Sequence, residues 1–197
     1  AKQLATARHF VQQENLSNTE IYELDAYHTE LPDASFDFTQ VRFVFAPVGR
    51  DDELLKEMLR VTKPGGILAI QEPDTHSWNP FPAHPAWHTL RTAILEAFKR
   101  GGGDFNAGQR TYHMLRRAGL EDVRIRAAVL ALQNNHPYMR SPLQFASSLR
   151  SRIVDNNILS AEELDRVVAE VEQIVSHPET VIHTFTVTQV WGRKPTH

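Results

Sequence analysis

Residues 31–74 read LPDASFDFTQVRFVFAPVGRDDELLKEMLRVTKPGGILAIQEPD, and this stretch decides the fold. Its apolar runs at residues 36–45 and 66–71 have the composition of strands. Between them, residues 51–61 place apolar side chains at helical spacing, after two aspartates suited to capping a helix. The turn Lys63-Pro64-Gly65-Gly66 ends that helix. Two apolar strands joined by a helical crossover predict an α/β fold with a parallel sheet covered by helices on both faces.

Acidic side chains follow the second of these strands. Glu72 and Asp74 come directly after the apolar run at residues 66–71. Open α/β sheets bind their ligands outside the carboxyl ends of the strands. We therefore expect Glu72 to orient a hydroxyl or amine of a substrate. The alternative is that this carboxylate caps a helix or a loop.

The rest of the chain reads as alternating helices and strands around one proline-rich segment. We expect helices at residues 1–13, 87–100, 108–118, 141–156 and 160–176, strands at 20–24, 122–132 and 181–192, and a loop without regular structure at 74–86. Ser160 and Glu163 have the spacing of a capping box. This pattern predicts a single domain over residues 1–197, with residues 134–178 as a helical lid or insertion within it.

Composition excludes several classes of function. The 197 residues contain 21 Lys+Arg and 24 Asp+Glu, and the resulting net charge of −3 gives no electrostatic basis for binding nucleic acid. No apolar stretch is long enough to span a bilayer, so we expect no membrane partner. The absence of cysteine excludes disulfides, thiolate zinc sites and a cysteine nucleophile, and is compatible with the cytoplasm. His84 and His88 have a metal-ligand spacing, but Pro85 between them argues against a metal site.

The order of these motifs resembles a known family. LPDASFD, an apolar strand, a helix ending in LRVTKPGG and a strand followed by an acid are similar to class I S-adenosylmethionine-dependent methyltransferases, in the branch that methylates quinone precursors and other small molecules. Residues 101–126 (GGGDFNAGQRTYHMLRRAGLEDVRIR) and 187–195 (VTQVWGRKP) extend the resemblance. It implies a Rossmann-like sheet with an antiparallel edge hairpin near the carboxyl terminus. It also implies S-adenosyl-L-methionine as the cofactor, and transfer of its methyl group to an oxygen, nitrogen or carbon of a small-molecule acceptor.

One part of the family pattern is absent. The family begins with a strand, a GxGxG-type loop and a helix, then a strand ending in an acid, and this sequence contains no GxGxG. We therefore expect the N-terminal strands of the sheet to be missing. The predicted strand at residues 20–24 then has no neighbour in its own chain, and unpaired strand groups are costly. We expect residues 1–30 to be displaced, exchanged with a partner in a homodimer, or completed by other polypeptide; pairing of residues 20–25 with 38–45 would contradict this.

The resemblance also implies a cofactor site. Asp25 and Ala26 correspond to the family's contacts with the adenine, although Asp25 equally suits a turn. Arg42 and Phe43 end a strand where the family's backbone faces the methionine end of the cofactor and its side chains wall the methyl-transfer centre. The alternative for these two residues is a strand core with one solvated arginine.

An acceptor site is expected nearby. The segment at residues 76–88 is rich in histidine and aromatic residues, and we expect Trp78 to wall an apolar pocket and His76 to act as the general base. Arg110 and Tyr112 lie where the family has a polar segment over the site, and they are candidates for orienting the substrate. The alternatives are an ordinary surface loop and a glycine-hinged turn before a capped helix.

Three functions remain open on the sequence alone. The first is a small-molecule methyltransferase. The second is a non-catalytic methyltransferase-like fragment or interaction module that cannot bind the cofactor alone, which the absent glycine loop favours. The third is a nucleotide-dependent oxidoreductase on a related sheet, against which the KPGG turn and the missing dinucleotide fingerprint argue.

Overall fold

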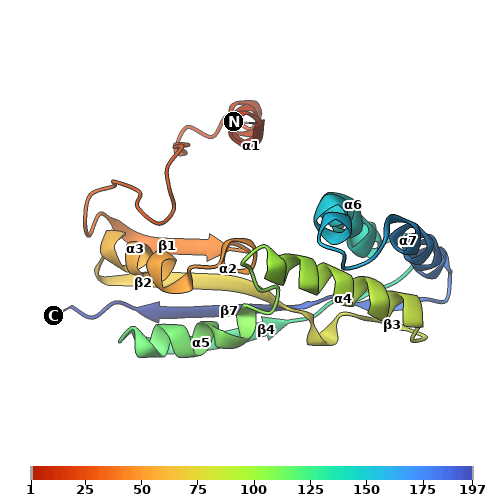
Figure 1. Cartoon of the computed structure of the whole chain (residues 1–197). Helices are drawn as coiled ribbons and strands as arrows, with labels where there is room; N and C mark the ends of the chain where they lie inside the picture. Colours follow the sequence, from red (N-terminus) through yellow and green to blue (C-terminus); the bar gives the residue numbers. More distant parts are fainter. Residues whose placement is uncertain (1, 197) are drawn as a thin grey trace.

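The computed structural model describes residues 2–196, which form a four-stranded sheet, a small three-stranded sheet and the helices around them (Figure 1). In chain order the elements are α1 (Lys2–Gln13), β1 (Phe36–Arg42), α2 (Phe45–Val48), α3 (Asp51–Val61), β2 (Thr62–Asp74), η1 (Thr75–Ser77), β3 (Asn79–Phe81), α4 (Pro85–Arg100), α5 (Gly108–Arg117), β4 (Glu121–Ala128), β5 (Ala131–Leu132), η2 (Pro137–Arg140), α6 (Ser141–Asp155), α7 (Ala161–Ser176), β6 (Val181–His183) and β7 (Thr186–Arg193). Within this part of the chain, no helix has the length and apolar character needed to cross a membrane.

The main sheet has the strand order β1-β2-β7-β4. β1 and β2 are parallel and are joined through α3, which confirms the crossover predicted from residues 31–74. β7 lies antiparallel between β2 and β4, so the sheet ends in the predicted antiparallel pair. The Rossmann-like fold class is therefore confirmed for the strands that this chain contains.

One face of the main sheet is covered and the other is largely open. On the covered face Leu68, Ile70 and Val190 are fully buried, and α5 packs against β2, β4 and β7. The opposite face carries Phe38, whose side chain is 53% exposed, and the half-buried Trp191. The prediction of helices on both faces is thus wrong for this part of the sheet, because α1 stands well away from it (Figure 1).

β1 forms an edge of the main sheet, and the predicted strand before it does not form. Residues 20–24 have no regular structure, and the segment around them joins α1 to β1 as an extended connection (Figure 1). An isolated strand without a partner cannot satisfy its backbone groups, which accounts for the failed prediction. Within residues 2–196 no pairing links residues 20–25 to residues 38–45, so the pairing that would contradict the expectation for residues 1–30 is not found. The choice between displacement, exchange with a partner and completion by other polypeptide stays a prediction.

Several predicted boundaries shift. The strand predicted at residues 36–45 ends at Arg42, because the chain turns there into α2. The segment 74–86 is not wholly irregular, since it contains η1 and β3. Each of the two late strands is interrupted, and the short pieces β5 and β6 pair with β3 in the second sheet, in the order β3-β6-β5.

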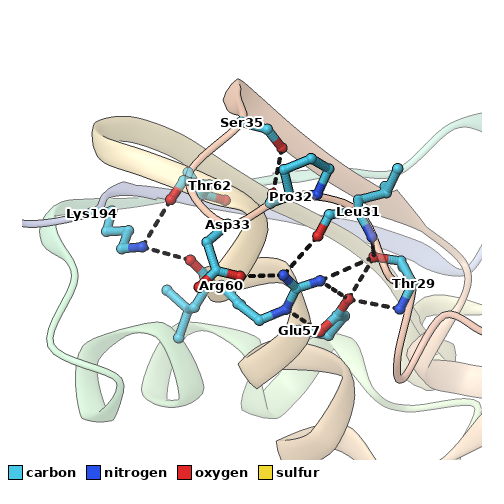
Figure 2. A network of polar contacts seen from close by, with 10 residues as sticks. Thr29, Leu31, Pro32, Asp33, Ser35, Glu57, Arg60, Thr62 and Lys194 are labelled. Atoms are coloured by element: carbon cyan, nitrogen blue, oxygen red, sulfur yellow. Dashed lines mark hydrogen bonds and ion pairs between the residues drawn. The ribbon is translucent and has the colours of Figure 1, made fainter.

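An ion pair between the buried Glu57 and the partly exposed Arg60 ties the segment before β1 to α3 (Figure 2). Arg60 donates from Nε to Glu57 Oε2 at 2.9 Å and from Nη2 to Glu57 Oε1 at 2.7 Å. The same guanidinium donates to the Leu31 carbonyl at 2.7 Å and pairs with Asp33. Glu57 also accepts from the backbone N–H of Thr29 at 2.8 Å. Because of the bond from Arg60, the pKa of Glu57 falls from 4.5 to about 2 although burial opposes the shift.

The carboxyl-terminal end of the chain closes the same region. Lys194 Nζ donates to the carbonyls of Leu59 at 2.7 Å and Thr62 at 2.8 Å (Figure 2). These carbonyls belong to the last turn of α3 and the residue after it, where a cation is favoured by the helix dipole. The KPGG segment that starts β2 is therefore held by the residue that follows β7.

Residues 134–178 contain η2, α6 and α7. The predicted capping box is present at the start of α7: Ser160 Oγ accepts from the N–H of Glu163 at 3.1 Å, and Glu163 accepts from the N–H of Ser160 at 2.9 Å. Leu164, Val167 and Val171 form a buried stripe on this helix. α6 and α7 both pack against α4, beyond the carboxyl ends of β1 and β2 (Figure 1).

Candidate functional site

The turn that follows β1 is held by a buried carboxylate from β2. Glu72 has no exposed surface, and it accepts from the backbone N–H groups of Val44 at 2.8 Å, Phe45 at 3.0 Å and Ala46 at 3.1 Å. Burial raises the pKa of Glu72, and the three N–H donors oppose that shift. These bonds match the alternative that the Glu72 carboxylate caps a helix or a loop, and not contact with a substrate. Glu72 therefore shapes the site through the backbone that it holds.

The backbone held in this way has an unusual conformation. Phe43 has φ of +55°, in the left-handed region that non-glycine residues seldom adopt. Its N–H donates to the carbonyl of Gln71 at 2.9 Å, so β1 and β2 remain bonded up to the point where the chain turns. Such strain persists where surrounding contacts fix it, and it is often found at functional sites.

A cavity of about 390 Å³ opens beside this turn. It lies at the carboxyl ends of β1 and β2, on the open face of the main sheet, and is closed on the far side by η2 and α6. The lining residues are Arg42, Phe43, Gln71, Trp78, Ala128, Leu130, Tyr138, Ser141, Gln144, Phe145, Thr184, Phe185, Val187 and Gln189. Its volume is within the range of about 300–1,000 Å³ that is usual for small-molecule sites.

Aromatic rings form the walls of this cavity. Trp78 is 1% exposed, and its ring meets those of Phe145 and Phe185 edge-on at 5.8 and 5.9 Å between centroids. Phe43 meets Phe185 edge-on at 5.9 Å. Trp87 Nε1 donates to the carbonyl of Trp78 at 3.0 Å and fixes its backbone. Edge-to-face aromatic packing is favourable and directional, so these walls are rigid.

The structure brings three of the predicted site residues together and separates the others from them. Arg42, Phe43 and Trp78 line the cavity, and Asp25, Ala26, Glu72, His76, Arg110 and Tyr112 do not. The division follows the sheet: Trp78 lies on the open face, while Asp74 and α5 lie on the covered face.

His76 is an exposed residue of η1, on the α5 side. Its Nδ1 lies 2.6 Å from Asp74 Oδ1 and 2.8 Å from Gln109 Nε2. Burial raises the pKa of Asp74, but the bonds from His76 and Gln109 outweigh it and lower the pKa overall. A carboxylate at Nδ1 leaves Nε2 as the nitrogen that can accept a proton. The role of His76 as general base stays a prediction.

Arg110 joins α5 to α3. Its guanidinium pairs with the carboxylates of Asp51 and Asp104, so its charge is already compensated. Tyr112 is half-buried and packs edge-on against His113, with 5.7 Å between ring centroids. The pair between Arg110 and Asp51 connects α5 to α3, and the ring contact of Tyr112 lies within α5. Substrate orientation by Arg110 and Tyr112 remains a prediction.

Asp25 and Ala26 are exposed residues in the connection before β1. Asp25 Oδ1 accepts from the N–H of Tyr27 at 2.9 Å, which is the turn that the alternative interpretation predicts. The Tyr27 hydroxyl lies 3.3 Å from the carbonyls of Val48 and Gly49, so this turn is anchored beside α2. A contact of Asp25 and Ala26 with adenine stays a prediction.

Sequence reasoning missed much of the cavity wall. Phe145 comes from α6 and Phe185 from the bend between β6 and β7, and nothing in the sequence places either beside Trp78. The sequence did offer a sign of Gln71 and Gln189, because each is a polar residue within a predicted strand. The two residues pair directly across β2 and β7. Gln71 lies near the carboxyl end of β2, which is where open α/β sheets bind their ligands.

Comparison with known proteins supports the resemblance. Residues 1–70 match the family model described as "Methyltransferase domain". The chain is 37% identical over 76 residues to a demethylmenaquinone methyltransferase of Parafrankia sp., a match that covers 39% of this chain and 26% of that protein. Among solved structures, the YcgJ protein of Bacillus subtilis has a TM-score of 0.59 at 15% identity, covering 98% of this chain and 79% of that one.

The fold is that of the class I methyltransferases. A further solved structure, phosphoethanolamine N-methyltransferase 2 of Haemonchus contortus in complex with phosphomonomethylethanolamine and S-adenosylhomocysteine, has a TM-score of 0.54 at 16% identity and covers 98% of this chain and 41% of that one. The predicted resemblance is confirmed. The match to the Parafrankia relative spans about a quarter of that relative's length, so the activity of such a complete protein is a proposal for this chain.

Proposed function

We propose that this chain takes part in methyl transfer from S-adenosylmethionine to a small-molecule acceptor bound in the cavity beside Trp78. The single observation that carries the proposal is the place of this cavity: it lies at the carboxyl ends of β1 and β2, next to the turn that Glu72 holds. The match of residues 1–70 to a methyltransferase domain supports the same function.

This chain contains residues suited to one part of a cofactor-binding site. The strained turn at Phe43, held by a buried carboxylate, is the kind of preorganised backbone that receives a ligand. The sequence has no glycine-rich loop, and the edge of β1 is open. We propose that Arg42 and Phe43 meet the methionine end and that Asp25 and Ala26 meet the adenine.

The role of this chain in the reaction is to position the acceptor and exclude water. S-adenosylmethionine, if bound, would supply a methyl group that its sulfonium sulfur activates for transfer to a nucleophile, with a neutral thioether as the leaving group. The rings of Trp78, Phe145 and Phe185 orient the acceptor and keep water out, and alignment accounts for most of such a rate enhancement. An acceptor that must lose a proton needs a base. His76, positioned by Asp74, is the candidate from the sequence, but it lies on the α5 side of the sheet and outside this cavity.

Residues 134–178 serve as a lid in this proposal. Tyr138, Ser141, Gln144 and Phe145, which come from η2 and α6, form the side of the cavity opposite the sheet. A lid on rigid helices that pack against α4 orders one wall of the site. We place the reaction in the cytoplasm, a location with which the cysteine-free sequence is compatible.

Calorimetric titration with S-adenosylhomocysteine, and in parallel with reduced nicotinamide dinucleotide, tests the proposed function. We expect saturable binding of S-adenosylhomocysteine and none of the dinucleotide. The reverse result favours an oxidoreductase. Failure of a folded protein to bind either compound contradicts cofactor binding by this chain and favours an interaction module.

A specific observation supports that second function. β1 has an unpaired edge, and its side chains Phe36 and Phe38 are 41% and 53% exposed. Exposed apolar edge strands pair readily with another chain. In this alternative, a strand of a second copy pairs with β1 in a homodimer or by strand exchange. Light scattering should then show a dimer that Phe38→Lys converts to a monomer, and a monomer at all concentrations contradicts it.

A further inference from the structure

We propose that the free edge of β4 is a docking site for an extended acidic segment of another protein, which adds to the main sheet as a further strand. The proposal names a kind of partner and goes beyond methyl transfer. Its charged part, Arg124 and Arg126, lies outside the cavity beside Trp78. Three properties of β4 carry it: an unpaired backbone edge, two arginines without partners and exposed apolar side chains.

β4 ends the main sheet on the side away from β1. It pairs with β7 alone, and within residues 2–196 no strand lies on its other side (Figure 1). From Arg124 onward its pairing with β7 is regular, and every residue from 124 to 130 is exposed. About half of the backbone N–H and C=O groups of an edge strand point away from the sheet, where another strand can bond to them.

The side chains of β4 alternate between the two faces of the sheet. Ile125 lies opposite Val190, which is buried on the covered face, so Ile125 lies on that face too. Arg124 lies opposite Trp191 on the open face, and Arg126, two residues further along, shares that face. The edge therefore offers a row of arginines on one face and an apolar side chain, 55% exposed at Ile125, on the other.

The two arginines have no partner in the part of the chain that the structure describes. Within residues 2–196 neither Arg124 nor Arg126 takes part in an ion pair or a side-chain hydrogen bond. Residues 123–135 contain no acid, and neither does β7. The acids of β4, Glu121 and Asp122, come before its regular part. Acidic side chains on an added strand would lie directly across from the arginines, and such opposite-charge pairs stabilise neighbouring strands.

A second copy of this chain does not fit the same edge. If the β4 strands of two copies paired about a twofold axis, the arginines of both copies would face one another on the open face, and like charges opposite one another destabilise a strand pair. Charged side chains also protect edge strands from pairing with any strand. A protected edge would bind no strand, whereas a docking edge would bind one of opposite charge.

The complementary segment alternates acidic with apolar residues. Its acids would lie over Arg124 and Arg126, and its apolar side chains would cover Ile125 on the covered face. Addition of an extended segment to a sheet edge draws affinity from backbone hydrogen bonds and specificity from alternate side chains. A nucleic acid or an anionic membrane would answer the charge but has no extended polypeptide backbone to match the edge, so the edge favours a protein.

Peptides of about eight residues, within the usual length of a strand, test the proposal. The acidic probe alternates glutamate with valine, and the matched probe has lysine in place of each glutamate. In fluorescence anisotropy titrations of the folded chain, we expect the acidic probe to bind at least tenfold more tightly than the lysine probe. Nitrogen-15 NMR should place the shifts at the amides of residues 124–128 and leave those of β1, the opposite edge, unchanged.

A charge-reversed variant makes the test specific. Combining Arg124→Glu with Arg126→Glu should reverse the preference, so that the lysine probe binds at least tenfold more tightly than the acidic probe. This gain of binding would also show that the variant is folded. Arg8→Glu is the matched control, because Arg8 is exposed on α1, away from the main sheet, and should leave both affinities within twofold (Figure 1).

Two kinds of result overturn the proposal. Equal affinity for the two probes, or binding of neither by the folded chain, leaves the arginines as protection of the edge only. An acidic probe methylated at every backbone nitrogen keeps its charge but loses the N–H groups that a strand donates. If it binds as tightly as its parent, or if phosphatidylserine vesicles bind the chain and the peptides do not, the edge attracts anions without strand pairing. None of these measurements involves a cofactor, so each result is independent of the proposed function.

Discussion

Replacing Arg60 by Met should be among the most damaging changes outside the core. Glu57 is only 5% exposed, and Arg60 compensates its charge through two nitrogens (Figure 2). Removing one partner of a buried ion pair costs about 3–5 kcal/mol. The Arg60 side chain is 29% exposed and Glu57 keeps its bonds from Thr29, so we expect a loss of about 2–4 kcal/mol in the free energy of unfolding.

The assay is urea unfolding of the wild type, Arg60→Met, Glu57→Gln and the double variant. We expect a coupling energy above about 1 kcal/mol, because the two side chains share one network. Arg166→Met is the matched control: Arg166 pairs with Glu170 on the surface of α7, and its loss should cost only about 0.3–0.5 kcal/mol. If Arg60→Met costs no more than Arg166→Met, the segment before β1 is not held as described.

The pH dependence of the same variants has a definite sign. The pKa of Glu57 is lowered from 4.5 to about 2, so its stabilising contribution is present above pH about 4.5 and is lost as the pH falls toward 2. The stability advantage of the wild type over Glu57→Gln should shrink over that window. An advantage that stays constant from pH 6 to pH 2.5 contradicts the ion pair.

Three further predictions concern the cap, the turn and the buried carboxylate. Ser160→Ala should lower the free energy of unfolding by about 1 kcal/mol in thermal melts. An unchanged free energy of unfolding would contradict the capping box. Gly49→Ala should cost about 2 kcal/mol or more, since φ is +65° and a Cβ would lie 2.3 Å from the Gly102 carbonyl oxygen; a neutral result refutes that packing. Because burial raises the pKa of Glu72 above its ordinary value of 4.5, its contribution is present at low pH and lost as the pH rises. Glu72→Gln should therefore gain stability relative to the wild type as the pH rises above 4.5, and the opposite trend refutes it.

Local sequence signals predicted the parts of the fold that depend on near neighbours. The capping box at Ser160 and the helix at residues 51–61 need only a few adjacent residues to be recognised, and the structure contains both. The predicted KPGG turn lies within β2, where Gly65 has φ of +76° and the pairing with β1 shifts register, so it is an irregular part of the strand and not a separate turn. The strand expected at residues 20–24 failed for a physical reason, because a strand exists only with a partner and the order of residues does not show whether one is present.

The candidate site was predictable only in part. Arg42, Phe43 and Trp78 lie at strand ends or just beyond, where ligand sites occur, and the structure brings them to one cavity. Phe145 and Phe185 reach the same cavity through the packing of α6 and the bend before β7, which no local pattern encodes. The ion pair between Arg60 and Glu57 could be guessed from helical spacing, but its bonds to Leu31 and Thr29 depend on a loop about 28 residues away.

Titration of the nitrogen-15-labelled chain with S-adenosylhomocysteine, followed by NMR, tests the central claim most directly, because it detects weak binding and locates it. The account predicts saturable shifts concentrated at the amides of residues 42–46, in the turn that Glu72 holds, and at the side-chain indole of Trp78. A folded spectrum that does not change, or shifts confined to residues far from that turn, would contradict it.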